Sequence, residues 1–203
     1  EDALAGVSRA IRDYARWLAR HGEETGAAGT GFEITEERQG FGPFHPGDKA
    51  ALFAPDRKPL TEMDMERLLR LMAHSREDLM TVIEDIPSEI LGKEYTEGWT
   101  IDRILRHIGG AEVWYVTRIA HTWNPDGYDE HRSSGDMVEW LTWSREAAVA
   151  RLSSLSEKER SLIFYPAHYT EHPEETWTAR KVFRRFLEHE REHTAQIQEL
   201  LEK

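Results

Sequence analysis

The last stretch of the chain, residues 177–203, constrains the fold more than any other feature. Its apolar residues recur at three- and four-residue spacings and are Val182, Phe183, Phe186, Leu187, Ile197, Leu200 and Leu201. This spacing is the period of an amphipathic helix, which must bury one face against partner elements. His189 and His193 fall on the same apolar face. The predicted helix therefore carries two imidazole rings, one turn apart, into the protein interior.

Partner helices for this element are predicted upstream. Three further segments share its period, namely residues 61–87, 99–124 and 136–152. Thr61 is placed as the N-cap of the first, and Pro and Gly residues separate the segments. Residues 155–176 form a connection longer than a bundle hairpin requires, which can cross the bundle or cover its open end. The sequence therefore predicts an all-α fold, a four-helix bundle over residues 59–203.

The second and fourth predicted helices begin with the same Trp-Thr pair, at residues 99–100 and 177–178. A threonine at the N-cap accepts a hydrogen bond from a free backbone N–H of the first turn. The preceding tryptophan can pack on the apolar residue four positions beyond the cap, Ile104 or Val182, as a hydrophobic staple. Such staples are structural features, so the repeat predicts helix starts rather than a function.

Residues 1–58 differ in composition and form the other predicted domain. A leading amphipathic helix over residues 3–20 is closed by Gly22, and a Gly- and Pro-rich stretch follows it. Only residues 32–34 and 51–53 look strand-like. We therefore expect a small irregular α(+β) segment before the bundle, with the domain boundary after residue 58.

Composition excludes several classes of function. The 38 acidic and 26 basic residues give a net charge of −12, which repels phosphate backbones, so we expect no nucleic-acid partner. The chain contains neither a run of about 18 apolar residues nor a signal-like start, so we expect no membrane partner and a cytoplasmic location. It has no cysteine, which leaves His, Asp and Glu as the candidate metal ligands.

A third histidine, His107, lies near the inner edge of the second predicted helix. Counted from the N-caps, His107 lies about 10 Å along its helix, and His189 and His193 lie about 16 and 22 Å along theirs. A modest stagger of the two helices would bring the three rings together. Three imidazoles without a fourth protein ligand describe an open site for Zn²⁺, Ni²⁺ or a similar ion, completed by water or substrate. The alternative is a set of core histidines satisfied by hydrogen bonds.

The last helix also spells the H-E-x-x-H pattern of zinc metalloproteases, from His189 to His193. The extended form of that pattern has Gly three residues and His six residues after the second histidine. This chain has Gln196 and Glu199 at those positions. Any third ligand must therefore come from upstream, which disfavours a metalloprotease.

Other residues are candidates for supporting roles. Three acidic residues could orient the histidine rings, although charged helix surface is the simpler interpretation of Glu112, Glu188 and Glu192. Three aromatic residues could line a pocket, although core packing is the simpler interpretation of Trp114, Tyr115 and Trp123.

A second pair of histidines, His168 and His172, is also four residues apart. Pro166 and Pro173 bracket this pair in a loop, which favours a solvated or capping role over metal binding.

These motifs resemble a known family. His107 in the run Leu105-Arg106-His107-Ile108, followed by an H-x-x-x-H pair on a last helix that opens with Trp-Thr, looks like the DinB-like family over residues 60–203. The resemblance implies a four-helix bundle, a metal site made by His107, His189 and His193, and a homodimer. It also implies kinship with metal-dependent thiol transferases and isomerases that use small-molecule thiols. Residues 3–22 resemble the helix of small HicB-like modules.

Two functional hypotheses follow. In the first, the chain is an enzyme in which a divalent ion, Zn²⁺ or Ni²⁺, activates a low-molecular-weight thiol cosubstrate or water against an electrophilic small-molecule substrate. In the second, the ion ties two helices together in a binding or structural protein without catalysis. The hypotheses differ in whether the protein completes the coordination shell of the ion.

Overall fold

The computed structural model of the chain describes residues 2–25, 31–38, 51–95, 99–166, 168 and 174–202. It divides into two compact units, residues 1–38 and residues 39–203. No helix in the described ranges is long and apolar enough to cross a membrane.

The first unit contains the predicted leading helix, α1 (Asp2–Arg20). Gly22 ends it in the left-handed conformation, with φ of 71°, which glycine adopts without steric cost. The N–H of Glu23 bonds to the carbonyl of Leu18, and the N–H of Gly22 bonds to that of Ala19, which is the Schellman pattern of helix termination. The HicB-like resemblance and the domain boundary after residue 58 stay predictions.

The expected strands are absent from the described residues. Residues 31–38 and 51–53 are extended or irregular and pair with no other strand. The prediction of strands at residues 32–34 and 51–53 was therefore wrong. Each stretch has too few alternating apolar residues to form a sheet without a partner strand, and the described chain supplies none.

The second unit is built on four long helices, which are α2 (Glu62–Ile83), α4 (Ile101–Thr117), α6 (Met137–Ser153) and α8 (Ala179–Leu201). Short helices connect them or precede them, and these are η1 (Pro55–Arg57), α3 (Ser88–Leu91), α5 (Tyr128–Ser133) and α7 (Glu157–Ser161). The all-α prediction for this part of the chain is confirmed.

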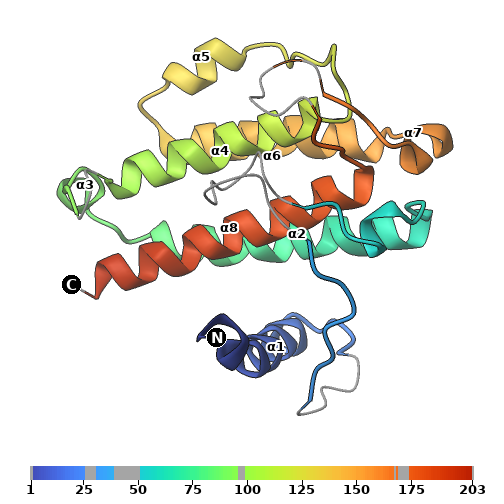
Figure 1. Cartoon of the computed structure of the whole chain (residues 1–203). Helices are drawn as coiled ribbons and strands as arrows, with labels where there is room; N and C mark the ends of the chain where they lie inside the picture. The colour runs from blue at the N-terminus through green and yellow to red at the C-terminus, as the bar shows by residue number, and fades with distance from the viewer. Residues whose placement is uncertain are drawn as a thin grey trace. The chain divides into compact units, whose positions relative to one another are not determined.

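The four long helices pack in a ring (Figure 1). Helix α8 lies between α2 and α4, and α6 contacts both α4 and α2 on the other side. Their apolar faces form the core of the bundle, in which Leu79, Ile104, Leu141 and Phe183 are fully buried. The two helices that carry the histidines of interest, α4 and α8, are therefore neighbours.

The predicted N-caps are confirmed. The side-chain oxygens of Thr61, Thr100 and Thr178 each accept a hydrogen bond from the backbone N–H three residues ahead, at 3.0–3.2 Å. Each bond satisfies one of the free donors at the start of a helix. The three caps fix where α2, α4 and α8 begin, and hence how far along α4 and α8 the histidines lie.

The tryptophan before each of the last two caps has a partner beyond the predicted apolar one. Trp99 packs beside the apolar cluster that contains Ile104, and a cation at the third helical position also covers each indole. The guanidinium of Arg103 lies 4.5 Å from the Trp99 ring, and the ammonium of Lys181 lies 4.1 Å from the Trp177 ring. These cation–π contacts strengthen both helix entries.

Helix α4 ends at Thr117, earlier than the predicted end at Asn124. Arg118 and Ile119 turn inward and are almost fully buried. The guanidinium of Arg118 stacks on Trp114 and donates to the carbonyl of His168 at 2.8 Å. Tertiary contacts thus end the helix, although the residues beyond Thr117 have suitable helical spacing.

The long connection before α8 contains α7 and one isolated bridge. Phe164 and Trp177 exchange two backbone hydrogen bonds, at 2.8 and 2.9 Å. The bridge holds Trp177, the residue before the N-cap of α8, against Phe164. Of the two histidines in this connection, His168 offers its carbonyl to Arg118, and His172 lies outside the described residues.

A buried ion-pair network joins the four long helices, and each helix contributes one charged residue. These residues are Arg76 from α2, Glu112 from α4, Arg145 from α6 and Glu190 from α8, and we call them the Arg/Glu network. Arg76 contacts Glu112 at 2.6 Å and Glu190 at 2.7 Å, and Arg145 contacts both carboxylates as well. Two positive and two negative charges therefore compensate one another inside the bundle.

Candidate metal centre

Helices α4 and α8 bring His107, His189 and His193 together. The Nε2 atom of His189 lies 2.9 Å from that of His107 and 3.2 Å from that of His193. One nitrogen from each of the three rings lies within 4.8 Å of the chosen nitrogens of the other two. The two histidines one turn apart on α8 and the one on α4 thus meet, as the helix stagger predicted, and we call this group the three-histidine centre.

The spacing of the three nitrogens matches what a single ion requires. Zn²⁺ binds imidazole nitrogen at about 2.0–2.1 Å, so two ligand nitrogens of a tetrahedral site lie about 3.3 Å apart. The two observed Nε2 separations are within a few tenths of an ångström of that value. A small adjustment of the rings would let all three bind one ion.

Hydrogen bonding cannot satisfy the same arrangement. The Nε2 atom of an imidazole has one in-plane position, which holds either a proton or a lone pair. His189 Nε2 faces two other nitrogens at hydrogen-bonding distance and can bond to only one of them at a time. A cation, in contrast, accepts three lone pairs at once. The geometry therefore fits metal binding better than a set of hydrogen-bonded core histidines.

Gln196 orients one of the rings. Its side-chain oxygen lies 2.7 Å from Nδ1 of His193. When Nδ1 donates its proton to this oxygen, Nε2 carries the lone pair and faces the centre. In the sequence, Gln196 stands out only as a departure from the metalloprotease pattern. The available signal was its position, three residues after His193 and therefore on the same helix face.

The centre favours neutral imidazoles. Burial, together with the neighbouring histidines and Arg185, lowers the pKa of His189 to about 2. Protein atoms that displace part of the water around the His107 ring, together with His193 and Arg103, lower its pKa to about 4. Burial also lowers the pKa of His193, against the opposing effect of Gln196. All three rings are therefore unprotonated near neutral pH, which is the form that binds metal.

Burial differs across the centre. The side chain of His189 is buried, that of His193 is partly buried, and that of His107 is exposed. The Trp99 ring meets His107 edge-on, with 5.8 Å between centroids, and the Tyr115 ring meets His189 in the same way at 5.7 Å. The centre is thus held against aromatic side chains and is reached from the His107 side.

Among the described residues, the carboxylates of the three acidic candidates do not join the group of histidine nitrogens. Glu112 is buried in the Arg/Glu network, so its interpretation as charged helix surface was wrong. Glu188 pairs with Arg184 and Arg185, and Glu192 is exposed. These carboxylates are therefore committed elsewhere or solvated.

The glutamate of the H-E-x-x-H spelling is also committed elsewhere. Glu190 is 1% exposed and is bound by both arginines of the Arg/Glu network. Burial would raise its pKa, but Arg76 and Arg145 hold the pKa below its usual value. A carboxylate held in this way cannot serve as the general base that the protease pattern requires, which strengthens the case against a metalloprotease.

The aromatic candidates are core residues. Tyr115 is 1% exposed, and Trp114 and Trp123 pack against the same apolar cluster. The interpretation as core packing therefore holds for all three.

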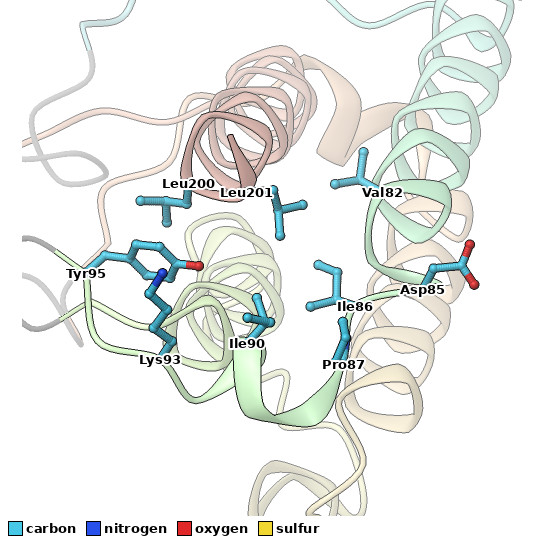
Figure 2. Close-up of a pocket in the computed structure, with 9 residues that line it drawn as sticks. All are labelled: Val82, Asp85, Ile86, Pro87, Ile90, Lys93, Tyr95, Leu200 and Leu201. Carbon is cyan, nitrogen blue, oxygen red and sulfur yellow. The ribbon is translucent and has the colours of Figure 1, made fainter. Parts of the chain in front are cut away.

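A separate pocket of about 400 Å³ lies at the end of the bundle (Figure 2). Aliphatic side chains from α2, α3 and α8 face one another across it, among them Val82, Ile90 and Leu201. Its wall is linked to the three-histidine centre, because the N–H of Tyr95 bonds to the carbonyl of Trp99, whose ring touches His107.

Comparison with known proteins gives one match. Residues 60–203 match the model of the family described as the DinB family. No curated protein and no solved structure matches the chain significantly.

Proposed function

The chain belongs to the DinB family, and we propose that it is a divalent-metal-dependent enzyme whose three histidines leave part of the coordination shell of the ion to a small molecule. His107, His189 and His193 would be the ligands, and Zn²⁺ or Ni²⁺ suits their imidazole nitrogens. The reaction would be a transfer to or from a small thiol, or a hydrolysis, at an electrophilic small substrate.

One observation carries this proposal. The Nε2 atom of His189 faces the Nε2 atoms of both His107 and His193, and hydrogen bonding can satisfy only one of these contacts. Removing three such nitrogens from water without full hydrogen bonding costs free energy, and binding a shared cation offsets that cost.

The donor set supports a catalytic ion rather than a closed structural one. Within the described ranges, no fourth histidine or carboxylate joins the group. Structural zinc sites usually have four protein ligands, whereas catalytic sites have three and keep one position for water or substrate. A bound ion of this kind lowers the pKa of a coordinated thiol or water and so yields a nucleophile near neutral pH.

Elemental analysis of the purified protein tests metal binding. We expect about one ion per chain in the wild type and none in His107→Ala or His189→Ala. His121→Ala, which removes an exposed histidine outside the centre, should retain the ion. A wild-type protein that is metal-free and takes up neither Zn²⁺ nor Ni²⁺ would sink the proposal.

The competing function is a metal-stabilised binding or structural protein. Three histidine ligands are compatible with this role, because an ion bound to them would join α4 to α8. Cobalt substitution separates the two, since the visible spectrum of Co²⁺ responds to a new ligand. If added small thiols change that spectrum, the shell is open, as an enzyme requires. An unchanged spectrum at saturating thiol would favour the structural role.

A further inference from the structure

Arg185 lies one helical turn before His189 on α8. Residues four positions apart share a helix face, so the two side chains leave α8 in the same direction. Arg185 is 6% exposed. A guanidinium this deeply buried needs compensating partners, because its charge is costly to remove from water.

The partners of Arg185 compensate its charge and its N–H donors incompletely. One terminal nitrogen lies 3.3 Å from the Tyr115 hydroxyl, which is a neutral partner because burial raises the pKa of that phenol. The other donates to the Glu188 carboxylate at 2.9 Å. The Nε atom is buried and has no hydrogen-bond partner within the described part of the chain.

Glu188 is a weak partner for a buried cation. Its side chain is 43% exposed, and both of its oxygens also accept bonds from Arg184 at 3.0 Å. It can therefore remain with Arg184 when another anion takes its place beside Arg185. The arginines of the Arg/Glu network differ, because each is held by two buried carboxylates.

Arg185 is joined to the three-histidine centre through Tyr115. Its guanidinium contacts the Tyr115 hydroxyl at 3.3 Å, and the Tyr115 ring meets the His189 ring edge-on, with 5.7 Å between centroids. The guanidinium therefore lies beside the His189 side of the centre. A ligand bound at the centre would lie about one helical turn, roughly 5–6 Å, from this cation.

We propose that Arg185 is the anion-binding subsite of the three-histidine centre and that the small molecule bound there carries a carboxylate. This inference rests on the proposed metal-dependent function. The carboxylate of Glu188 already occupies one edge of the guanidinium, which indicates the chemistry that the position accepts. A ligand carboxylate would replace it and engage the planar donors of arginine.

The test uses the full chain loaded with Co²⁺ and two thiols of equal chain length, one ending in a carboxylate and the other in a neutral alcohol. These are 4-mercaptobutyrate and 4-mercapto-1-butanol, whose chains are long enough to span one helical turn. Binding is followed by the sulfur-to-cobalt absorption band. We expect the wild type to bind the carboxylate at least about 10-fold more tightly, because hydrogen bonds to charged groups have that magnitude.

Variants assign the preference to Arg185. Arg185→Met should bind both thiols equally while its cobalt content is unchanged. Arg185→Lys should keep part of the preference. Arg180→Met, which removes the same charge further up α8, should keep all of it. If Arg185→Met retained the preference, direct chelation by the carboxylate would explain it and the inference would be overturned.

The wild type alone also decides the matter if a variant fails to fold. Equal affinity for the two thiols overturns the anion subsite and leaves the metal-dependent function standing. Failure of the wild type to bind Co²⁺ overturns both.

Discussion

Two polar clusters interrupt the apolar interior of the same bundle, and they are built in opposite ways. The Arg/Glu network takes one charged residue from each long helix and balances them two against two. The three-histidine centre takes neutral rings from only two helices and points their nitrogens at one another. The charges of the first cluster balance one another. The ring nitrogens of the second converge without enough hydrogen-bond partners.

The two clusters are adjacent in sequence as well. His189 belongs to the centre and Glu190 to the network, because successive residues on a helix point in directions about 100° apart. Burial would lower the pKa of Arg145, but Glu112 and Glu190 raise it, so the network stays charged. The contrast teaches that buried polarity alone does not indicate a functional site. Buried charges that neutralise one another stabilise the fold. Ring nitrogens that converge without enough hydrogen-bond partners instead indicate a bound ion or ligand.

The largest expected effect concerns the network. Glu112→Ala should lower the free energy of unfolding by about 3–5 kcal/mol, because it leaves Arg76 and Arg145 as buried charges with one carboxylate between them. Denaturant titration measures it. Asp102→Ala, which removes one partner of the exposed ion pair with Arg106, should cost about 0–1 kcal/mol. Equal losses in the two variants would remove the distinction between a complete buried network and surface ion pairs.

The next effect separates the centre from the network. Zn²⁺ at 100 times its dissociation constant should raise the free energy of unfolding of the wild type by about 2.7 kcal/mol. His189→Ala should abolish this gain, whereas His121→Ala should retain it. Thermal unfolding with and without metal measures both. A metal-dependent gain that survives His189→Ala would place the ion elsewhere.

Acidification should weaken the metal-free protein through His189. Its folded-state pKa of about 2 lies below its ordinary value of 6.5, so the unfolded chain binds more protons as the pH falls. The contribution of His189 to stability is intact above pH 6.5, and about 2 kcal/mol of it is lost by pH 5. Denaturant titrations should therefore show that the free energy of unfolding falls more steeply from pH 8 to pH 5 for the wild type than for His189→Ala. Parallel curves would contradict this.

The smallest effect concerns the orientation of one ring. Gln196→Ala removes the acceptor at His193 Nδ1 and should weaken metal affinity by about 10-fold. Competition with a chromophoric chelator measures the change. Gln196→Glu should retain most of the affinity, since a carboxylate also accepts from Nδ1. Gln198→Ala provides the matched control, because Gln198 is exposed on the same helix. A change of equal size in both alanine variants would show that Gln196 acts only through helix stability.

Local patterns determined much of this protein in advance. The period of the apolar residues predicts the four long helices, and the threonine caps predict three of their starts, because both depend on residues within a few positions of one another. The spacing from those caps also predicts that His107 can meet the pair on α8. The role of these histidines as metal ligands stays a prediction.

Only the tertiary structure decided what lies on the other side of each buried polar group. It placed Glu112 and Glu190 between arginines of α2 and α6, ended α4 at Thr117 through contacts of Arg118, and left Arg185 beside the centre with partial compensation. Periodicity tells which helix face a residue occupies, but it does not say which residue of another helix lies opposite. The partners of these groups come from segments distant in the chain, so the packing angles and stagger of the helices choose them.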